Sequence, residues 1–577
     1  MRSAFWLNAL ALALALFGLL AAQPLSVRAD PGTLYVATDG DDSGLCGSIA
    51  TRCRTVQRAV DLAGTGDTVK VAAGTYSDPD TASQGRLVAV DKTITLRGGY
   101  DASFADPPDP TVHTTMLDAQ RQGRVICITD GASPMIEGFT IAGGDATGLG
   151  GTEGGFDAGG GIYCYAAHPT ITNNTITDNI ASSSNPAHGG GIHLQECRRS
   201  LVSGNSVTGN TASGGGSGRG GGLSLIYSDE AIIRSNSIVS NTGSTAGTGS
   251  GGGLYAYGSN VTIDGNTVEG NVGSSNGYGD GGGIWIEYGV VVLRKNTVLG
   301  NSAQTPSGGS GGGVWGVYCE EIDLYGNLII DNAAQSGRGV TINQGSNFTL
   351  TNNVIAANRS GCGPWQECRG ALCVSASSDY PSSGTLLHNT IADNAGNEES
   401  AGQGLYVSDY VSIDLINNVI AGHTVGITST HPASSTVTTD HTLFDDNGTN
   451  YGSGVTNSNE LAGDPAFVNP TLGDYHLLTR SAAIDQGVAA GVPDDIDGDP
   501  RPLSAGYDIG ADEWDPSKPP PTSTPTSTAS STPTPSATPT RTPTARATAT
   551  PSATPTSTVT VVQERLYLPL LLRHYGF

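Results

Sequence analysis

One repeat constrains the fold of this chain more than any other feature. In Gly251–Asn271 three glycines precede two segments of alternating residues, and the repeat closes on the motif Asn-Thr-Val-x-x-Asn. Clean glycine triplets begin at residues 159, 189, 220, 251, 281 and 311, so the period is 30 or 31 residues. Self-similarity at such a period indicates stacked supersecondary units.

The repeated unit is built of short strands. Apolar residues alternate with period two, Val, Ile and Thr are frequent, and Gly or Asn interrupts each segment after a few residues, whereas a helix needs apolar residues at i, i+3 and i+4. One repeat is too small to bury its own apolar face. Stacking coil upon coil buries a continuous apolar column and pairs the strands in parallel. The sequence therefore predicts an all-β chain with a parallel β-helix over residues 120–450.

The recurring asparagines have a structural interpretation. Asn tolerates the left-handed backbone conformation of a sharp corner, and its amide can bond to the Asn of the next coil. In the repeat Gly251–Asn271 these positions are Asn266 and Asn271, and His423 takes the second position in a later copy. We expect the Asn columns to lie at one corner of the coil.

Composition narrows the classes of partner. The 577 residues carry a net charge of −26, the isoelectric point is about 4.5, and the sequence contains no basic cluster. Nucleic acid is therefore excluded as an expected partner, whereas neutral sugars and divalent cations are compatible with such a surface.

The N-terminus predicts export. Residues 1–29 combine Arg2, an apolar run over Ala9–Ala22 and a small-residue pattern ending at Ala29, which is typical of a secretory signal peptide; cleavage after Ala22 is the other option. An uncleaved membrane anchor is the alternative, although the run is shorter than the roughly 20 residues of a spanning helix. No later segment is long enough to span a membrane, so we expect an extracellular protein.

Nine cysteines fit an oxidising compartment, in which disulfides persist. The odd number leaves at least one thiol unpaired. The pairs spaced to close small local loops are Cys46 with Cys53 and Cys362 with Cys368.

Residues 30–119 are expected to hold an N-terminal cap and the first coils. Thr33–Thr38 has the pattern of a strand, and the apolar spacing in Thr55–Ala63 suits a short amphipathic helix. The open end of a solenoid must be covered, and this helix is well placed to cover it.

Two stretches resemble known families. The N-terminal part of the chain resembles the start of bacterial secreted proteins with right-handed β-helix repeats, the pectate-lyase-like superfamily. The resemblance rests on the stretches "YVATDGDDSG", "CRTVQRAVDLAGTGDTVKVAAGTY" and "TLRGGYD". A closing region over residues 451–515 resembles the choice-of-anchor Q domain. The resemblance rests on Asp474–Val488 and Asp494–Trp514. The first resemblance implies a right-handed helix with substrate along one face. It identifies a fold and leaves the activity open.

The catalytic motifs of that superfamily are missing from the sequence. Its hydrolases carry Asn-Thr-Asp, Asp-Asp, Gly-His-Gly and Arg-Ile-Lys in order; the nearest match here is His188-Gly189, where Ala187 replaces the first glycine. Its lyases use a calcium-binding carboxylate cluster with an Arg or Lys base, and no motif singles out such a base here. We therefore expect binding rather than catalysis.

The first residue after each glycine triplet is apolar and faces inward, so alternation places the second residue on the outer face. Parallel coils lie about 4.8 Å apart, so aromatic residues at this position would form a ladder that can stack sugar rings. The alternatives are a stack that only stabilises the sheet, or one covered by the Gly/Ser loops before each triplet. Glu287 stands near this ladder and could hydrogen-bond to sugar hydroxyls. The candidate carbohydrate-binding residues are Tyr163, Tyr255, Trp285, Glu287, Trp315 and Tyr406.

Asp495, Asp497 and Asp499 alternate as in a calcium-binding loop. The EF-hand pattern fails, because Gly506 stands where its Glu belongs. Calcium is therefore the only cofactor that the sequence suggests. The alternative is that these three aspartates are ordinary turn residues.

The C-terminal residues predict attachment. Residues 516–558 form a Pro/Thr/Ser-rich linker that cannot bury a core. Residues 559–577 end in a short apolar run, which we interpret as a sorting or attachment peptide; a small strand docked on another module is the alternative.

Together these features predict an exported, cell-surface β-helix protein that binds polysaccharide or a cell-envelope component, in an adhesin-like or scaffold role. A polysaccharide lyase or glycoside hydrolase with an unrecognised site is one alternative. A structural surface-layer component is the other.

Overall fold

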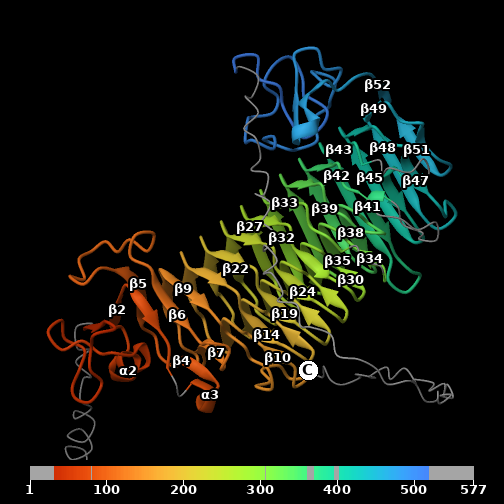
Figure 1. Cartoon of the computed structure of the whole chain (residues 1–577). Helices are drawn as coiled ribbons and strands as arrows, with labels where there is room; N and C mark the ends of the chain where they lie inside the picture. The colour runs from red at the N-terminus through yellow and green to blue at the C-terminus, as the bar shows by residue number, and fades with distance from the viewer. Residues whose placement is uncertain are drawn as a thin grey trace, which may run out of the picture. The chain divides into compact units, whose positions relative to one another are not determined.

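The structure is a computed structural model that describes residues 32–78, 81–303, 305, 307–359, 370–394 and 402–518. The described chain is almost entirely β-structure. Successive coils follow one another from the N-terminal cap to the last strands (Figure 1). The expected signal peptide and terminal peptide, and the linker from residue 519 onward, lie outside the described residues.

Three long sheets, called A, B and C here, form the walls of the coil, and every strand in them pairs in parallel with its neighbours. Sheet A has 15 strands, sheet B 14 and sheet C 13. This confirms the predicted parallel β-helix. Sheet A runs from β1 (Thr33–Val36) to β51 (Val455–Ser458), sheet B from β3 (Gly74–Tyr76) to β52 (Leu461–Ala462), and sheet C from β4 (Arg86–Val90) to β50 (Thr449–Tyr451).

One coil shows how the repeat becomes structure. In it β26 (Leu254–Tyr257) belongs to sheet C, β27 (Val261–Asp264) to sheet A and β28 (Thr267–Glu269) to sheet B. Period-two alternation turns one residue in two toward the interior, and equivalent residues of successive coils stack. Ile263 pairs with Leu293, which pairs with Leu324, and all three are buried. Burying such a side chain stabilises the fold by about 2 kcal/mol.

Helix α2 (Val56–Leu62) covers the first coil, as the sequence predicts. Its Thr55 N-cap accepts a hydrogen bond from the backbone N–H of Arg58, which satisfies one free donor of the first turn. Val56 and Val60 join the main apolar core. A second short helix, α3 (Thr81–Gln84), was not predicted.

The Gly/Ser loops before the triplets form two further sheets that the sequence did not predict. The four-stranded sheet D runs from β14 (Ile180–Ser182) to β29 (Val272–Ser274). The six-stranded sheet E runs from β10 (Asp157–Ala158) to β34 (Gly309–Ser310). These loops are therefore ordered layers of the solenoid, paired from coil to coil.

The Asn columns lie at two corners, one at each end of the sheet B strands, so the expected single corner is wrong. Both corners turn within a few residues, and each requires its own side chain to satisfy backbone groups. In the second column the Nδ2 of Asn241 donates to Oδ1 of Asn271 at 3.0 Å and to the carbonyl oxygen of Val207 at 2.9 Å. The predicted bonds between coils are confirmed.

His423 interrupts the second column. Asn394 Nδ2 lies 3.3 Å from His423 Nε2, while Nδ1 of this buried ring has no hydrogen-bond partner among the described residues. Burial lowers the pKa of His423 to about 4. The imidazole is therefore neutral in the folded chain at pH values at which an unfolded chain would protonate it.

We expect His423→Asn to make the protein more resistant to acid. A histidine pKa depressed by folding contributes stability that is present above the unfolded pKa near 6.5 and is lost as the pH falls toward 4. The variant should therefore gain about 2 kcal/mol relative to the natural chain between pH 7.5 and 4.5. Thermal denaturation at both pH values measures this. A gain of the same size in the exposed control His168→Asn would contradict the assignment to His423.

A closing region packs on the outer face of sheet B. Strands β53 (Phe467–Asn469) and β54 (Asp474–Leu477) form an antiparallel pair. Leu477 and Ile509 pack with Val419 of sheet B in a second apolar core. This region follows β52 and lies beside β43 (Thr390–Ala392) and β49 (Leu443–Asp445), where it is drawn in blue (Figure 1).

The structure contains the expected disulfide Cys46–Cys53 and a second one, Cys164–Cys197, that links adjacent coils. Cys373 is disulfide-bonded as well. The expected partners Cys362 and Cys368 lie outside the described residues. No described helix has the length and apolar character that crossing a membrane requires.

Candidate functional site

The predicted ladder is in register on the outer face of sheet C. Tyr255 pairs with Trp285, and Trp285 pairs with Trp315, on consecutive coils. Tyr163 lies earlier in the same column and stacks on His193, whose ring contacts His188, and His188 in turn contacts Tyr255. Tyr406 lies later in the column, and Thr341 and Cys373 separate it from Trp315. The structure thus joins Tyr255, Trp285 and Trp315 directly, links Tyr163 to them through two histidines, and leaves Tyr406 apart.

Sheet E covers this column. His188 lies 6.0 Å from the Tyr255 ring, edge on, and the Arg219 guanidinium lies 5.6 Å from the ring centroid. Tyr255 is therefore only 2% exposed, and burial raises its pKa. Its hydroxyl donates to Oε2 of Glu287 at 3.3 Å. The ring has no free face for a sugar, which matches the covered arrangement named among the alternatives.

The other predicted aromatics are also packed against protein. Tyr163 lies below the Arg124 guanidinium at 4.5 Å and donates to the carbonyl oxygen of Gly151. Trp285 and Trp315 are half-buried and stacked on each other at 4.6 Å. Tyr406 is 6% exposed. Their nearest partners are protein groups, so stabilisation of the coil stack is the role that these contacts support.

The layer between sheets C and E is polar as well as aromatic. His193 is fully buried, neither ring nitrogen has a hydrogen-bond partner among the described residues, and burial lowers its pKa to about 3. Burial also raises the pKa of Asp280 to about 7. Burial in this layer therefore favours the neutral form of both groups.

A second set of aromatic residues, which the sequence did not identify as a row, lies at the corner where the chain passes from sheet C to sheet A. Successive ring centroids lie 5.5, 5.5, 5.4 and 5.3 Å apart, so the rings form an unbroken row. We call this row the tyrosine ridge. Its members, in order, are Tyr227, Tyr257, Tyr288, Tyr318 and Tyr380.

The tyrosine ridge faces solvent. Tyr227, Tyr288 and Tyr380 are 44%, 42% and 52% exposed, and Tyr257 and Tyr318 are half-buried. Proteins usually bury rings of this size in part, so a row in which three of five rings are exposed is a candidate interaction surface. The row crosses successive coils and so extends along the solenoid axis.

Three ridge residues occupy a backbone conformation that disfavours them. Tyr227, Tyr288 and Tyr318 have φ values of 50°, 59° and 53°, and in the coil between the first two Gly258 takes this corner position with φ 55°. A bulky residue in the left-handed region costs on the order of 1 kcal/mol, which glycine avoids. The equivalent corner residues Ala166, Glu196 and Gln344 of other coils also have positive φ, so this conformation belongs to the corner of the solenoid whichever residue occupies it.

The ridge left a signal in the sequence. Tyr227, Tyr257, Tyr288 and Tyr318 recur at 30 or 31 residues, the period of the glycine triplets. The alternation rule did not find them because a corner breaks the alternation, and only the coil geometry shows that their rings touch.

The three predicted calcium ligands do not converge. Oδ1 of Asp495 accepts the backbone N–H groups of Asp497, Gly498 and Asp499 at 2.8 to 2.9 Å, and its Oδ2 accepts that of Glu513. Asp495 thus acts as a turn residue.

The neighbouring carboxylates are paired elsewhere. Oδ2 of Asp497 lies 2.8 Å from Nε2 of His476, and Asp499 bonds to the ammonium group of Lys518. Burial lowers the pKa of His476, but the hydrogen bond to Asp497 and the charge of Asp512 outweigh it and raise the pKa to about 10. His476 is thus held between carboxylates, which favour its protonated form, and its ligand atom lies within 4.8 Å of those of Asp497 and Asp512.

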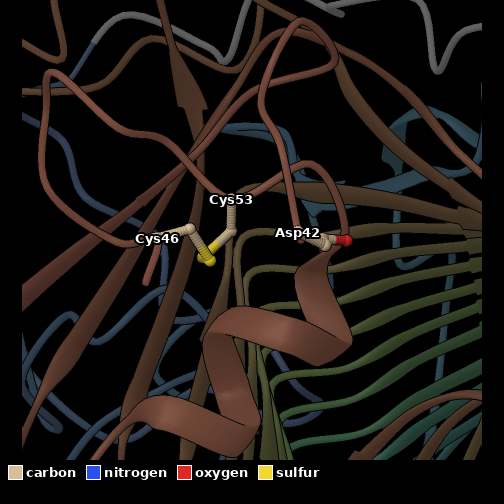
Figure 2. A group of neighbouring side chains, drawn as sticks. All are labelled: Asp42, Cys46 and Cys53. Carbon is tan, nitrogen blue, oxygen red and sulfur yellow. A yellow bond between two sulfur atoms is a disulfide. The ribbon is translucent and has the colours of Figure 1, made fainter. Parts of the chain in front are cut away.

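A second group with metal-ligand chemistry lies at the N-terminal cap. Figure 2 shows Asp42 near Cys46 and Cys53. The two sulfur atoms are bonded to each other, so neither is a thiolate. The Asp42 carboxylate accepts from the backbone N–H groups of Arg54 and Thr55 and from the Thr55 hydroxyl. This group therefore fastens the start of α2 and has no free ligand set.

Comparisons with known proteins agree with this architecture. The sequence model of the right handed beta helix region matches residues 115–301 and again 217–378. No curated protein matches the chain.

Several solved structures resemble the chain at low identity. A complex of XylC with xylose is 9% identical, with a TM-score of 0.42 and coverage of 83% of this chain and 98% of that one. Pectate lyase Pel9A is 12% identical, with a TM-score of 0.28 and coverage of 84% and 96%. The A-module of the mannuronan C-5 epimerase AlgE6 of Azotobacter vinelandii is 16% identical, with a TM-score of 0.29 and coverage of 71% and 94%.

Proposed function

This chain is a right-handed parallel β-helix protein, and we propose that it binds polysaccharide along the tyrosine ridge as an exported, cell-surface scaffold. One observation carries the proposal: five tyrosine rings stand in continuous contact along the coil axis, and three of them are more than two-fifths exposed.

Tyrosine suits this role chemically. Exposed ring carbons can pack against the C–H face of a sugar, and the hydroxyl can exchange hydrogen bonds with sugar hydroxyls, although Tyr288 and Tyr318 also stack on each other. Coils repeat at about 4.8 Å, so a linear chain lying along the axis meets a ring at each coil from Tyr227 to Tyr318, and then Tyr380 after one coil that has Gln344 at this corner. Several weak contacts then act together on one polymer.

Two observations support export and surface exposure. Cys46–Cys53 and Cys164–Cys197 are disulfides, and such bonds persist in oxidising compartments. The N-terminal pattern of residues 1–29 and the Pro/Thr/Ser-rich linker 516–558 are those of an exported protein whose folded part is held away from an envelope. A terminal peptide over 559–577 would provide the attachment.

The double variant Tyr288→Gly/Tyr318→Gly separates binding from folding. Loss of two stacking rings, each worth about 1 kcal/mol, should weaken polysaccharide binding at least tenfold. Thermal stability should change little, because the relief of two left-handed tyrosines offsets the loss of their ring contacts. A glycan array with the full chain, followed by titration of the best ligand, measures the first effect, and a thermal melt measures the second.

The matched control is Tyr165→Ala, which removes a tyrosine that is 39% exposed but lies outside the ridge. Its binding should equal that of the natural chain. A ridge variant with unchanged affinity and a clearly lower melting temperature would show that the row only stabilises the solenoid. Shortened products from the bound glycan would favour the lyase or hydrolase alternative.

A further inference from the structure

A groove of about 580 Å³ crosses the outer face of sheet A. Its lining comes from four consecutive strands: β36 (Glu321–Tyr325), β39 (Asn347–Thr351), β42 (Ser382–Leu387) and β45 (Val411–Ile416). Thr349 and Thr385 pair across it as outward-facing residues, and both are half-buried. Short side chains over successive coils leave the sheet hollow at this place.

The groove begins where the tyrosine ridge ends. Tyr318 precedes Glu320 of the lining by two residues, and Tyr380 precedes Ser383 by three. The rings of these two tyrosines lie 5.3 Å apart. The end of the ridge and the edge of the groove therefore lie close together along the chain.

Hydrogen bonds hold this entrance in shape. Nδ2 of Asn347 donates to the carbonyl oxygen of Glu320 at 3.2 Å. The Ser383 hydroxyl donates to Oδ1 of Asn347 at 3.0 Å. Three consecutive coils are thus tied together at the rim, so the groove is formed before any ligand arrives.

The charged side chains that line the groove are all acidic. The lining offers hydroxyl and amide groups together with the carboxylates of Glu320, Glu321 and Asp414, and it contains no Lys, Arg or His. Nearby Asp323 adds a further carboxyl group, whose pKa is raised by burial and then by the charge of Glu321. Such a surface can exchange hydrogen bonds with sugar hydroxyls but repels an anionic ligand.

We propose that this groove is a second subsite of the polysaccharide site, which receives a glycan free of carboxylate, sulfate and phosphate groups. The inference rests on the proposed function and adds the class of ligand. A neutral glycan and an amine-bearing one share the required chemistry. Uronate polymers are excluded from the groove by charge.

Three probes of the full chain test the class of ligand: a neutral β-glucan, its carboxymethylated form, and a chitosan oligosaccharide. Calorimetric titration should show at least tenfold weaker binding of the carboxymethylated glucan than of its parent, with the difference shrinking at high salt. If chitosan binds more tightly than the neutral glucan and this binding weakens with salt, the ligand is an amine-bearing glycan. If chitosan and the neutral glucan bind equally, the ligand is a neutral glycan. Tighter binding of the carboxymethylated glucan than of its parent would overturn the proposal.

Variants then locate the subsite. Thr385→Trp fills the groove and should reduce affinity for the preferred probe about tenfold. The control Thr262→Trp lies in the same outward column of sheet A but outside the groove, and it should bind as the natural chain does. Glu320→Lys with Glu321→Lys should raise affinity for the carboxymethylated glucan at least tenfold at low salt.

The outcomes separate the two proposals. If Thr385→Trp binds normally while Tyr288→Gly/Tyr318→Gly does not, the groove is no subsite and the ridge function stands. If the groove variant loses affinity while the ridge variant does not, the ridge proposal fails and the groove is an independent site. Binding of none of the three probes by the natural chain would overturn both.

Discussion

Asn241→Asp is expected to unfold the centre of the solenoid at neutral pH. The Asn241 amide nitrogen donates to the carbonyl oxygen of Val207 and to Oδ1 of Asn271, and the residue is fully buried. The substitution places a carboxylate oxygen against two acceptors. Two lost hydrogen bonds with buried, unsatisfied acceptors should cost about 3 kcal/mol or more. Urea denaturation with hydrogen exchange on the flanking coils measures the loss.

The pH dependence identifies the cause. Burial beside two acceptors should raise the folded-state pKa of the new carboxyl group, so the variant should be most stable below the unfolded value near 4 and lose stability as the pH rises toward 7. The control Asn276→Asp alters an exposed residue that donates once, to the carbonyl oxygen of Thr245. If Asn241→Asp and Asn276→Asp lose the same free energy of unfolding, the loss in Asn241→Asp does not come from breaking the buried Asn column.

Gly252→Ala is expected to prevent adjacent coils from closing in register. A Cβ at Gly252 would lie 2.4 Å from the carbonyl carbon and oxygen of Val272, and both are backbone atoms that cannot rotate away. Overpacking a core side chain costs about 1 to 3 kcal/mol, and a clash with backbone should reach or exceed the upper figure. The expected result is low soluble yield, or a melting temperature several degrees below that of the natural chain.

Two control glycines separate sterics from backbone conformation. Gly300 has φ 61°, and no atom lies within 4 Å of the position that a Cβ would take there, so Gly300→Ala should cost only the left-handed penalty of roughly 1 kcal/mol. Gly44 has neither constraint, and Gly44→Ala should be nearly neutral. If Gly252→Ala is as mild as Gly44→Ala, the triplet does not set the spacing of the coils.

The repeat pattern alone is enough to predict the solenoid. A period of 30 or 31 residues with internal alternation allows only short strands that stack, and it also indicates which residues face inward, as Ile263 and Leu293 do. Their side chains depend on neighbours at fixed sequence positions. The interior columns and the Asn-to-Asn bonds could therefore be predicted from the chain alone.

What covers each face of the coil could not be predicted in this way. Alternation correctly placed Tyr255 and Trp315 outside the apolar core, but the two-residue strands of sheet E that bury Tyr255 are too short to leave a pattern in the sequence. The Asn columns likewise proved to occupy two corners, because the angle between successive strands is a property of the closed coil.

Part of the candidate site could likewise be predicted from the sequence, and part could not. The tyrosines of the ridge are visible in the sequence as a period, but only the corner geometry brings Tyr288 and Tyr318 to 5.4 Å and turns their rings to solvent. Asp495 and Asp497 look like ligands of one ion in the sequence, whereas folding directs them to backbone amides and to His476. Local spacing fixes which residues share a face of a strand; contacts between segments far apart in the chain decide which of those residues remain free to bind.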